Sequence, residues 1–161
     1  MNFLRFLMFL SLGVWIGCLI FLPIVAQISF SLLPSPQLAG SVVRNSLIAL
    51  HWIGLSGGGL FLLCSLIVNQ ITQGKLAFVR PSHILVIVML ALTAFSQFSI
   101  IPHMDALRAA AGEIRTLPAD SPIRKQFDEL HSTSTHVEGA VLLLGIVLLY
   151  LTSRRLASSR S

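Results

Sequence analysis

The sequence predicts an all-α polytopic membrane protein, folded as an antiparallel up-down bundle of four transmembrane helices. Of its 161 residues, 55% are apolar and only 11% are charged, whereas a soluble domain carries about 25% charged residues. The apolar residues gather into four stretches, each long enough to cross a bilayer as a helix. Lipid offers no partner for backbone N–H and C=O groups, so stretches of this length without strand alternation are helices. We therefore expect a single membrane domain over residues 1–161, with the lipid bilayer as its first partner.

The four membrane spans are expected at residues 6–26, 47–68, 83–101 and 133–152. The first is too long for the apolar region of a signal peptide, so we predict that it is retained as a helix. Pro34 and Pro36 break the chain after it, and residues 70–81 join the second span to the third. Short connections impose antiparallel neighbours.

The third connection, residues 103–132, is the only sizeable hydrophilic segment and is expected to be an extramembrane helical hairpin. Its first part, up to Arg115, carries Asp105 and Arg108 at the i,i+3 spacing of a helical ion pair. The sequence Asp120-Ser121-Pro122 then has the pattern of a helix start. The fourth helix is therefore predicted to begin near Pro122 and to continue to about Ser153.

Basic residues predict the orientation. One side of the bundle receives six Lys or Arg residues and no acid, namely Arg5, Lys75, Arg80, Arg154, Arg155 and Arg160, while the other receives five together with all six acids. By the positive-inside rule, both termini are expected in the cytoplasm and the protein in the inner (plasma) membrane. The basic residues lie at the ends of apolar runs and form no stripe with aromatics, so no nucleic-acid partner is expected.

Antiparallel placement of the four helices brings polar residues to one level. His51, Gln97, His136 and Glu138, together with Gln27 at the end of the first span, all fall within about 10 Å of the predicted outer face. His103 and His131 lie just beyond this level, whereas His83 is alone on the other side. An ionisable group inside a membrane costs about 3 kcal/mol on insertion scales, and it usually faces a partner or a wet cavity.

Small residues suggest close packing. Gly54 and Gly58 follow His51 on one face of the second span, where they let a backbone or a flat cofactor come close. The same pair, and Gly13 with Gly17 on the first span, match the Gly-x-x-x-Gly motif, so the Gly-rich faces of these two helices offer a route to a homo-oligomer.

These residues suggest a cofactor site formed by His51, His131, Glu138 and Gln97, with His51, His131, His103 and His136 as candidate metal ligands. A metal ion or haem is the expected occupant, with haem b or copper as the candidates, because facing helices of a bundle can bring imidazole and carboxylate groups to one point. In this interpretation Glu138 balances charge or relays a proton, and Gln97 orients the ligands. The alternative interpretation is a structural role, in which the same residues only hold the helices together.

Four segments carry a resemblance to a known family. Leu50–Gly54, Ser96–Arg108, Phe127–His131 and Glu138–Gly145 resemble the transmembrane protein 205-like family of four-span membrane proteins, whose molecular activity is unassigned. More remotely, Trp15 followed by Pro23 is similar to the first helix of the CopD copper-resistance and HemJ protoporphyrinogen-oxidase groups. The HemJ likeness implies a haem-binding histidine about two turns before the tryptophan, and this sequence has Leu7 and Met8 there.

Function is thus predicted as a polar, His-rich site in a membrane protein. No H-E-x-x-H, P-loop, G-x-S-x-G or Cys-x-x-Cys motif is present, which removes the commoner enzyme fingerprints. Two other interpretations are a non-catalytic membrane assembly or interaction protein, and a subunit of an oligomeric small transporter.

Overall fold

The chain is almost entirely helical. The computed structural model describes residues 2–73 and 80–158, with side chains within 2–72 and 80–154. Lys75 and Arg160, which entered the orientation argument, lie outside the described residues, as does the side chain of Arg155. The helices are α1 (Asn2–Leu32), α2 (Pro36–Gln73), α3 (Pro81–Phe95), the π-helix η1 (Ser96–Ile100), α4 (Ile101–Ala111), the 3₁₀ turn η2 (Ile114–Thr116) and α5 (Pro122–Ser158).

Four helical segments are long and apolar enough to span a membrane, namely Asn2–Leu32, Pro36–Thr72, Pro81–Ala111 and Pro122–Arg154. Large apolar side chains on their outer faces are left exposed by the fold, among them Phe21, Leu63, Phe98 and Leu143. A water-soluble protein does not leave so many large apolar groups around its circumference. The chain is therefore a multi-pass membrane protein, as its composition predicts.

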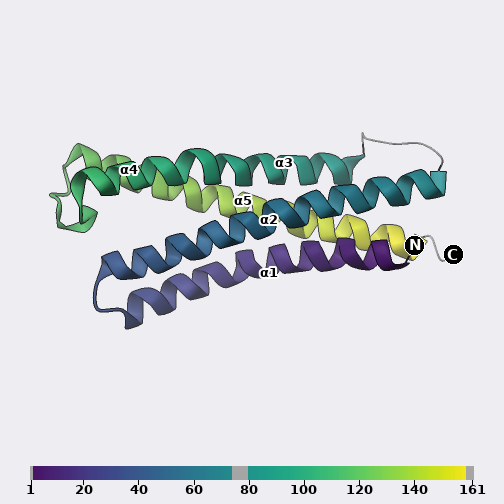
Figure 1. Ribbon diagram of the computed structural model, residues 1–161, viewed down its shortest axis with the longest axis horizontal. Coiled ribbons are helices and arrows are strands. Elements are labelled where there is room, and N and C mark those ends of the chain that lie inside the picture. The colour runs from purple at the N-terminus through teal and green to yellow at the C-terminus, as the bar shows by residue number, and fades with distance from the viewer. Residues whose placement is uncertain (1, 74–79, 159–161) are drawn as a thin grey trace.

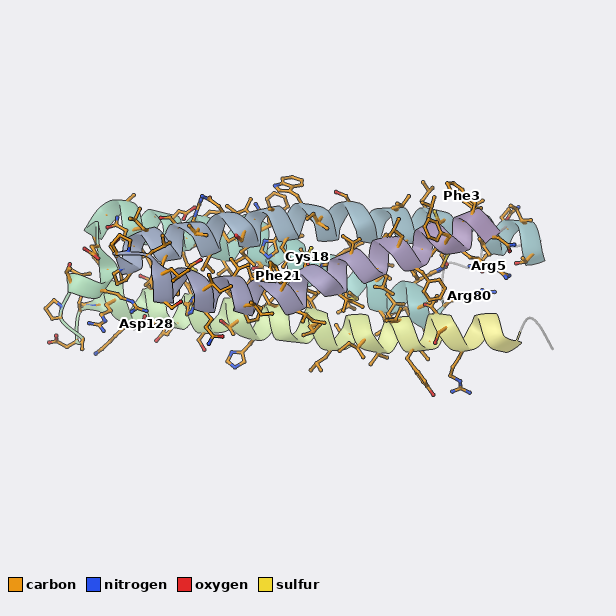
Figure 2. The ribbon with its side chains drawn as sticks, turned by 90° about the horizontal axis from the view of Figure 1, so that it is seen from below. Phe3, Arg5, Cys18, Phe21, Arg80 and Asp128 are labelled. Atoms are coloured by element: carbon orange, nitrogen blue, oxygen red, sulfur yellow. The ribbon has the colours of Figure 1, made fainter. Side chains whose placement is uncertain are left out.

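Consecutive helices run back and forth along the long axis of the molecule (Figure 1). The helices α1 and α2 form one hairpin, and the nearly continuous rod of α3, η1 and α4 pairs with α5. The start of α1 and the end of α5 lie at one end of the bundle, here called the terminal end. The α1–α2 link and the segment between α4 and α5 lie at the other, here called the connection end. Figure 2 places Arg5 and Arg80 toward the terminal end and Asp128 at the connection end.

The segment between α4 and α5 departs in part from the prediction. As predicted, α5 begins at Pro122. The helix before it ends earlier than expected, at Ala111, because Gly112 adopts a φ of 70°, a conformation that only glycine takes readily. Residues 114–116 then form a single 3₁₀ turn in place of the predicted continuation to Arg115.

A seven-residue spacing organises the interior in layers. On α2 the spacing links His51, Gly58 and Ser65; on the α3–η1 rod it links Gln97, Leu90 and His83. Contacts join the members pairwise, because His51 bonds Gln97, Gly58 packs against Leu90, and Ser65 bonds His83. On α5 the same spacing joins Glu138, Gly145 and Thr152, and Glu138 bonds His51. Seven residues are about two helical turns, so each layer presents the same face of every helix.

The middle layer is built on glycines that receive large side chains. A Cβ at Gly54 would collide with the indole of Trp15, and one at Gly58 would lie 2.9 Å from Trp15 Cζ3 and 2.7 Å from Leu90 Cδ2. Trp15 is accordingly only 1% exposed. The flat group that the Gly54–Gly58 face accommodates is therefore the indole of Trp15. This face is used within the chain, while Gly13 and Gly17 on α1 have open space around them.

This packing predicts that Gly54→Ala destabilises the protein, whereas Gly13→Ala does not. The added methyl at position 54 forces the indole of Trp15 to move, and overpacking of this kind costs about 1–3 kcal/mol. The measurement is the thermal unfolding midpoint of each purified variant in the same mild detergent. Equal midpoints for the two variants would contradict the packing described here.

Candidate intramembrane polar site

The central feature of the connection-end half is a triad of His51 on α2, Gln97 on η1 and Glu138 on α5. The Nδ1 atom of His51 lies 2.8 Å from Oε1 of Gln97, and its Nε2 atom lies 2.8 Å from Oε1 of Glu138. His51 is 0% exposed and the Glu138 side chain 13% exposed. One imidazole thus ties three helices together inside the membrane, where each polar atom is costly unless paired.

The number of protons in the triad depends on which way the Gln97 amide is turned and on the tautomer of His51. In the orientation described here the carbonyl oxygen of Gln97 faces His51. The Oε1 atom of Gln97 can only accept a hydrogen bond, so the Nδ1 atom that faces it carries a proton. One further proton is then shared between Nε2 of His51 and Oε1 of Glu138. Whichever atom carries it, the His51–Glu138 pair has no net charge, which is the arrangement that a low-dielectric interior favours.

Glu138 also has a polar atom without a bonding partner. Its second carboxyl oxygen, Oε2, is buried and makes no hydrogen bond, while Glu138 lines a large cavity at the connection end. A buried carboxyl oxygen without a partner is uncommon, and it leaves Glu138 with hydrogen-bonding capacity that the described side chains do not use. The triad is therefore linked to the cavity through Glu138.

The π-helix η1 sets the register of the rod that carries Gln97. Pro102 has no N–H to continue the regular helical ladder, and the preceding turn is widened, with Ile101 N–H donating to the Ser96 carbonyl. Two α turns take up about seven residues and a π turn adds about one. Gln97 and Asp105, eight positions apart, consequently both face α2, on which their partners His51 and Arg44 are seven positions apart.

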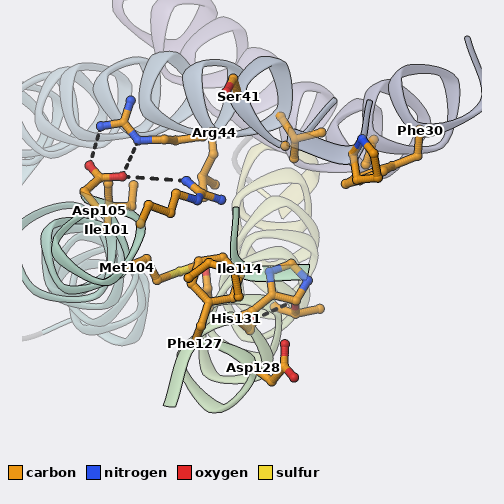
Figure 3. A pocket seen from close by; sticks show the side chains of 18 of the residues that line it. Phe30, Ser41, Arg44, Ile101, Met104, Asp105, Ile114, Phe127, Asp128 and His131 are labelled. Carbon is orange, nitrogen blue, oxygen red and sulfur yellow. Dashed lines mark hydrogen bonds and ion pairs between the residues drawn. The ribbon is translucent and has the colours of Figure 1, made fainter. Parts of the chain in front are cut away.

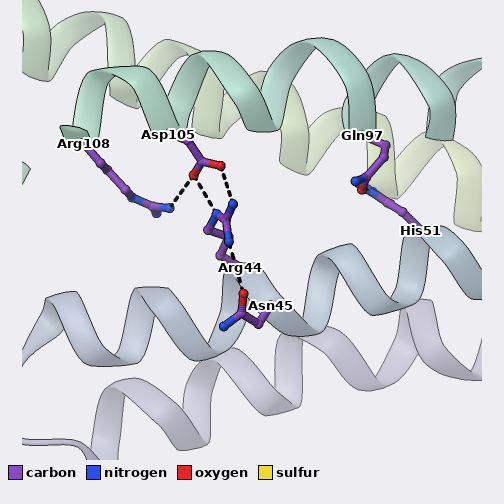
Figure 4. Close-up of polar contacts among 6 residues, drawn as sticks. All are labelled: Arg44, Asn45, His51, Gln97, Asp105 and Arg108. Atoms are coloured by element: carbon purple, nitrogen blue, oxygen red, sulfur yellow. Dashed lines mark hydrogen bonds and ion pairs between the residues drawn. The ribbon is translucent and has the colours of Figure 1, made fainter. Parts of the chain in front are cut away.

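Two turns from the triad lies a cluster of Arg44, Asp105 and Arg108 (Figure 4). Both Arg44 Nε and Nη2 donate to the carboxylate of Asp105, the first at 2.6 Å, and Nη1 donates to Asn45 Oδ1 at 3.1 Å. Arg108 Nη1 lies 3.6 Å from the same carboxylate. The predicted pair of Asp105 and Arg108 is thus present, but the shorter contact of Asp105 is with Arg44. The cluster holds two cations and one anion.

Between the two hairpins at the connection end lies a cavity of about 840 Å³, shown from close by in Figure 3. Its walls come from α1, α2, α4, η2 and α5. The triad residue Glu138 lies on its lining, as do Arg44, Asp105, Arg108 and His131. A volume of this size is typical of small-molecule sites, which range from about 300 to 1,000 Å³.

The remaining predicted site residues lie apart from His51. His131 lines the cavity but is exposed, and no hydrogen bond to His51 or Glu138 is formed. His136 is exposed on another face of α5, as the helical spacing predicts. His103 is exposed and bonds through Nδ1 to the Ser99 carbonyl of its own helix, at 2.7 Å. Gln27, which the sequence places in the polar level, is exposed and does not line the cavity.

The arrangement of these residues does not favour a metal centre. Within residues 2–72 and 80–154, no group of three or more His, Cys, Asp or Glu side chains is placed so that it could hold a metal ion. Both ring nitrogens of His51 are already bonded, so coordination of a metal or of haem iron would require His51 to give up Gln97 or Glu138. His51 and the exposed His131 are therefore not arranged as a ligand pair.

A second polar group lies in the terminal-end half. His83, which the sequence leaves alone on that side, is 2% exposed and bonds through Nε2 to Ser65 Oγ at 2.8 Å. One turn further along α2, Asn69 Oδ1 accepts a hydrogen bond from Arg80. Apolar side chains of the core, including Phe61, Val86 and Met89, fill the interior between this group and the triad.

Sequence reasoning missed the roles of two residues, Trp15 in the packing layer next to the triad and Arg44 in the cluster at the cavity. Trp15 was read as part of a family likeness, although a large aromatic seven positions from Leu22 and Met8 carries the same seven-residue signal as the layers. Arg44 was counted as a flanking charge. The sequence signal for Arg44 is its spacing of seven residues from His51. Asp105 and Gln97 are eight residues apart, and the two spacings correspond because the π turn before Pro102 adds one residue.

The fold and site define a class: a four-span membrane protein with a buried His–Glu–Gln triad beneath a cavity. The family model described as a domain of unknown function (DUF4149) matches residues 10–113, and the chain belongs to that family. The match covers α1, α2, the α3–η1 rod and α4, and thus includes His51, Gln97 and the Arg44–Asp105–Arg108 cluster. No match is found among curated proteins or among solved structures.

The triad predicts a non-additive pair of substitutions. His51→Leu leaves the carboxyl group of Glu138 buried without its partner, and breaking a buried pair in this way costs about 3–5 kcal/mol. Adding Glu138→Leu removes the orphaned acid and should recover most of the loss. The measurement is the thermal unfolding midpoint in detergent, with His136→Leu as the matched exposed control. A double variant as unstable as the sum of the two single variants would contradict the bond.

Proposed function

We propose that this protein is a proton-handling membrane protein, in which the His51–Glu138 pair takes up and releases a proton through the cavity at the connection end. The observation that supports this most directly is the buried imidazole of His51, bonded at both nitrogens, whose partner Glu138 lines the cavity and has a second carboxyl oxygen, Oε2, that makes no hydrogen bond. Intramembrane histidine–carboxylate pairs of this kind are typical of proton relays.

Turning over the Gln97 amide gives the pair two proton states, one neutral and one with a net negative charge on Glu138. With the Gln97 carbonyl oxygen toward His51, Nδ1 donates and the His51–Glu138 pair is neutral. With its amide turned over, the NH₂ group donates to Nδ1, Nε2–H donates to the Glu138 carboxylate, and the pair has lost one proton. Both states satisfy every ring nitrogen of His51. A half-turn of one amide therefore accompanies the release of one proton, and no buried nitrogen loses its bond.

The route of the proton runs through Glu138. The other ionisable groups that line the same cavity are Arg44, Arg108, Arg115, Arg124, Asp105, Glu113, Asp128 and His131. On the side away from the cavity, His51 packs in the layer next to Trp15, whose indole carries no charge. Proton exchange at the triad thus takes place from the connection end.

Haem and metal chemistry are not part of this proposal, because His51 has no free nitrogen to coordinate a metal. The proposal includes a relationship to the transmembrane protein 205-like family. This relationship is supported by the segment from Ser96 to Arg108, which forms the π turn and most of α4 and supplies Gln97 and Asp105. That relationship carries no assigned activity and adds no chemistry to the triad.

Orientation in the membrane completes the proposal. With both termini in the cytoplasm of the inner (plasma) membrane, the connection end and its cavity face outward. The described basic residues Arg5, Arg80 and Arg154 then lie on the cytoplasmic side. Self-association, if it accompanies this function, uses the exposed Gly13–Gly17 face of α1, because the Gly54–Gly58 face is covered by Trp15.

The test is a titration of the ring nitrogens of His51 by ¹⁵N nuclear magnetic resonance, on purified protein labelled in histidine. We expect a single one-proton transition, in which Nδ1 changes from donor to acceptor. In Glu138→Gln the shared proton has no carboxylate to bind, so the transition is lost or displaced. In Gln97→Leu the donor–acceptor change at Nδ1 disappears.

His136, exposed on the same helix as Glu138, serves as the internal control and should titrate in the same way in every variant. Resonances of His51 that stay constant throughout the titration in the unmodified protein would overturn the proposal. The triad would then be a fixed interhelical bond, and the interpretation as a membrane assembly protein would take its place.

A further inference from the structure

We propose that the cavity at the connection end binds a small acidic amphiphile, a molecule with one carboxylate or phosphate head group and an apolar body. This goes beyond the proton-handling role, because it concerns other residues of the cavity and requires no proton transfer at His51. Three observations carry it: the unequal charges of the Arg44–Asp105–Arg108 cluster, the placement of Arg108, and the apolar walls below it.

The cluster has one cation more than it has anions. Asp105 accepts two hydrogen bonds from Arg44, which occupy both of its oxygens, and Arg108 approaches the same carboxylate only at 3.6 Å. The side chain of Arg108 is 32% exposed and is therefore half-buried at the cavity. A guanidinium in that setting, without a carboxylate of its own, is a binding site for an anion, which it can hold through two parallel N–H bonds.

The surroundings hold Arg108 toward the cavity. Its guanidinium lies 5.0 Å from the ring centroid of Phe127 on α5, a cation–π distance. Its Nη2 atom also comes near Gly40 of α2, 3.8 Å from the position that a Cβ would take there. Arg108 is thus positioned between two hairpins by contacts that leave donors unused.

The other charges of the lining do not cancel this site. Four arginines and four acids line the cavity, so the number of charges favours neither sign. The arginines differ in their partners, since Arg44 is bonded to Asp105, Arg124 Nη1 donates to the Leu117 carbonyl and Arg115 lies over the ring of Phe30. Of the acids, Asp105 is bonded to Arg44 and Glu138 to His51, Asp128 is exposed on the α5 side (Figure 3), and Glu113 is half-buried.

Below the cluster the cavity is walled by apolar side chains, which come from α1, α4 and α5: Leu19, Leu22, Ala26, Ile101, Met104 and Leu142. Apolar walls favour an apolar ligand body, and the few polar groups at one end fix its orientation. The combination of one cationic end and an apolar body fits an amphiphile with an acidic head. It does not fit a hydrophilic anion, which would leave these walls uncovered.

The experiment uses the full-length protein in a neutral detergent, with lauric acid and dodecyl phosphate as probes and dodecanol as the uncharged match. Phosphatidylglycerol and phosphatidylcholine, compared in the same way, separate a bilayer lipid from a free single-chain acid as the source of the head group. Binding is measured by native mass spectrometry and by the shift of the thermal unfolding midpoint. We expect the acidic member of at least one pair to bind, and its neutral match to bind about tenfold more weakly or less.

Variants locate the site. Arg108→Gln should weaken binding of the acidic probe about tenfold or more, and Arg108→Lys should recover only part of it because lysine lacks the planar fork. Lys125→Gln removes the same charge from an exposed position outside the lining and should leave binding unchanged. Ala26→Trp fills the apolar part without altering any charge and should block the probe even if Arg108→Gln does not fold.

Equal binding of charged and uncharged probes would overturn the inference. Unchanged binding in a folded Arg108→Gln variant, or binding that survives Ala26→Trp, would do the same. So would the absence of binding by every acidic probe. The outcome is separate from that of the proton titration, since Arg108→Gln should keep the transition at His51. If His51 titrates but no probe binds, only the ligand proposal is wrong. If a probe binds but His51 does not titrate, only the proton-handling proposal is wrong.

Discussion

The bonds of His51 to Gln97 and Glu138 hold together helices that the chain joins only through distant connections. In water such bonds would contribute little, because each group could bond solvent instead. Inside a bilayer the alternative is an unpaired polar group, so the bonds select the arrangement in which both are made. The rest of the bundle is consistent with this one requirement: α2, the α3–η1 rod and α5 must meet with these residues at the same level.

That requirement passes along the helices through their periodicity. Because His51, Gln97 and Glu138 lie at one level, the positions seven residues away on each helix lie together at the next level. At that level Gly58 packs against Trp15 and Leu90, and Gly145 packs against Ile16 and Met89. A further seven residues bring Ser65 to His83. The apolar middle layer lies between two polar ones, so close packing there and hydrogen bonding on either side specify the same register.

Toward the connection end the two hairpins are joined by side chains across a cavity. The α1–α2 hairpin reaches the other through Arg44 on Asp105 and through Phe30 beneath Arg115. The splayed arrangement leaves a chamber whose lower boundary includes Glu138 and whose side includes Arg108. The buried acid Glu138 and the half-buried cation Arg108 thus line the same cavity.

The sequence by itself determined the helical membrane fold, the start of α5 at Pro122, and the level shared by His51, Gln97 and Glu138, because length, hydropathy and a rise of 1.5 Å per residue need no knowledge of neighbours. Tertiary structure decided which of the histidines is buried, since level along the membrane says nothing about rotation around a helix axis. In the tertiary structure His131 lines the cavity, and His103 bonds a carbonyl of its own helix. Ser65 bonds His83, and Trp15 packs against the Gly54–Gly58 face. Tertiary structure also brought Arg44 to Asp105. This contact depends on the one extra residue in the π turn, and the position of that turn is set when the helices pack against one another.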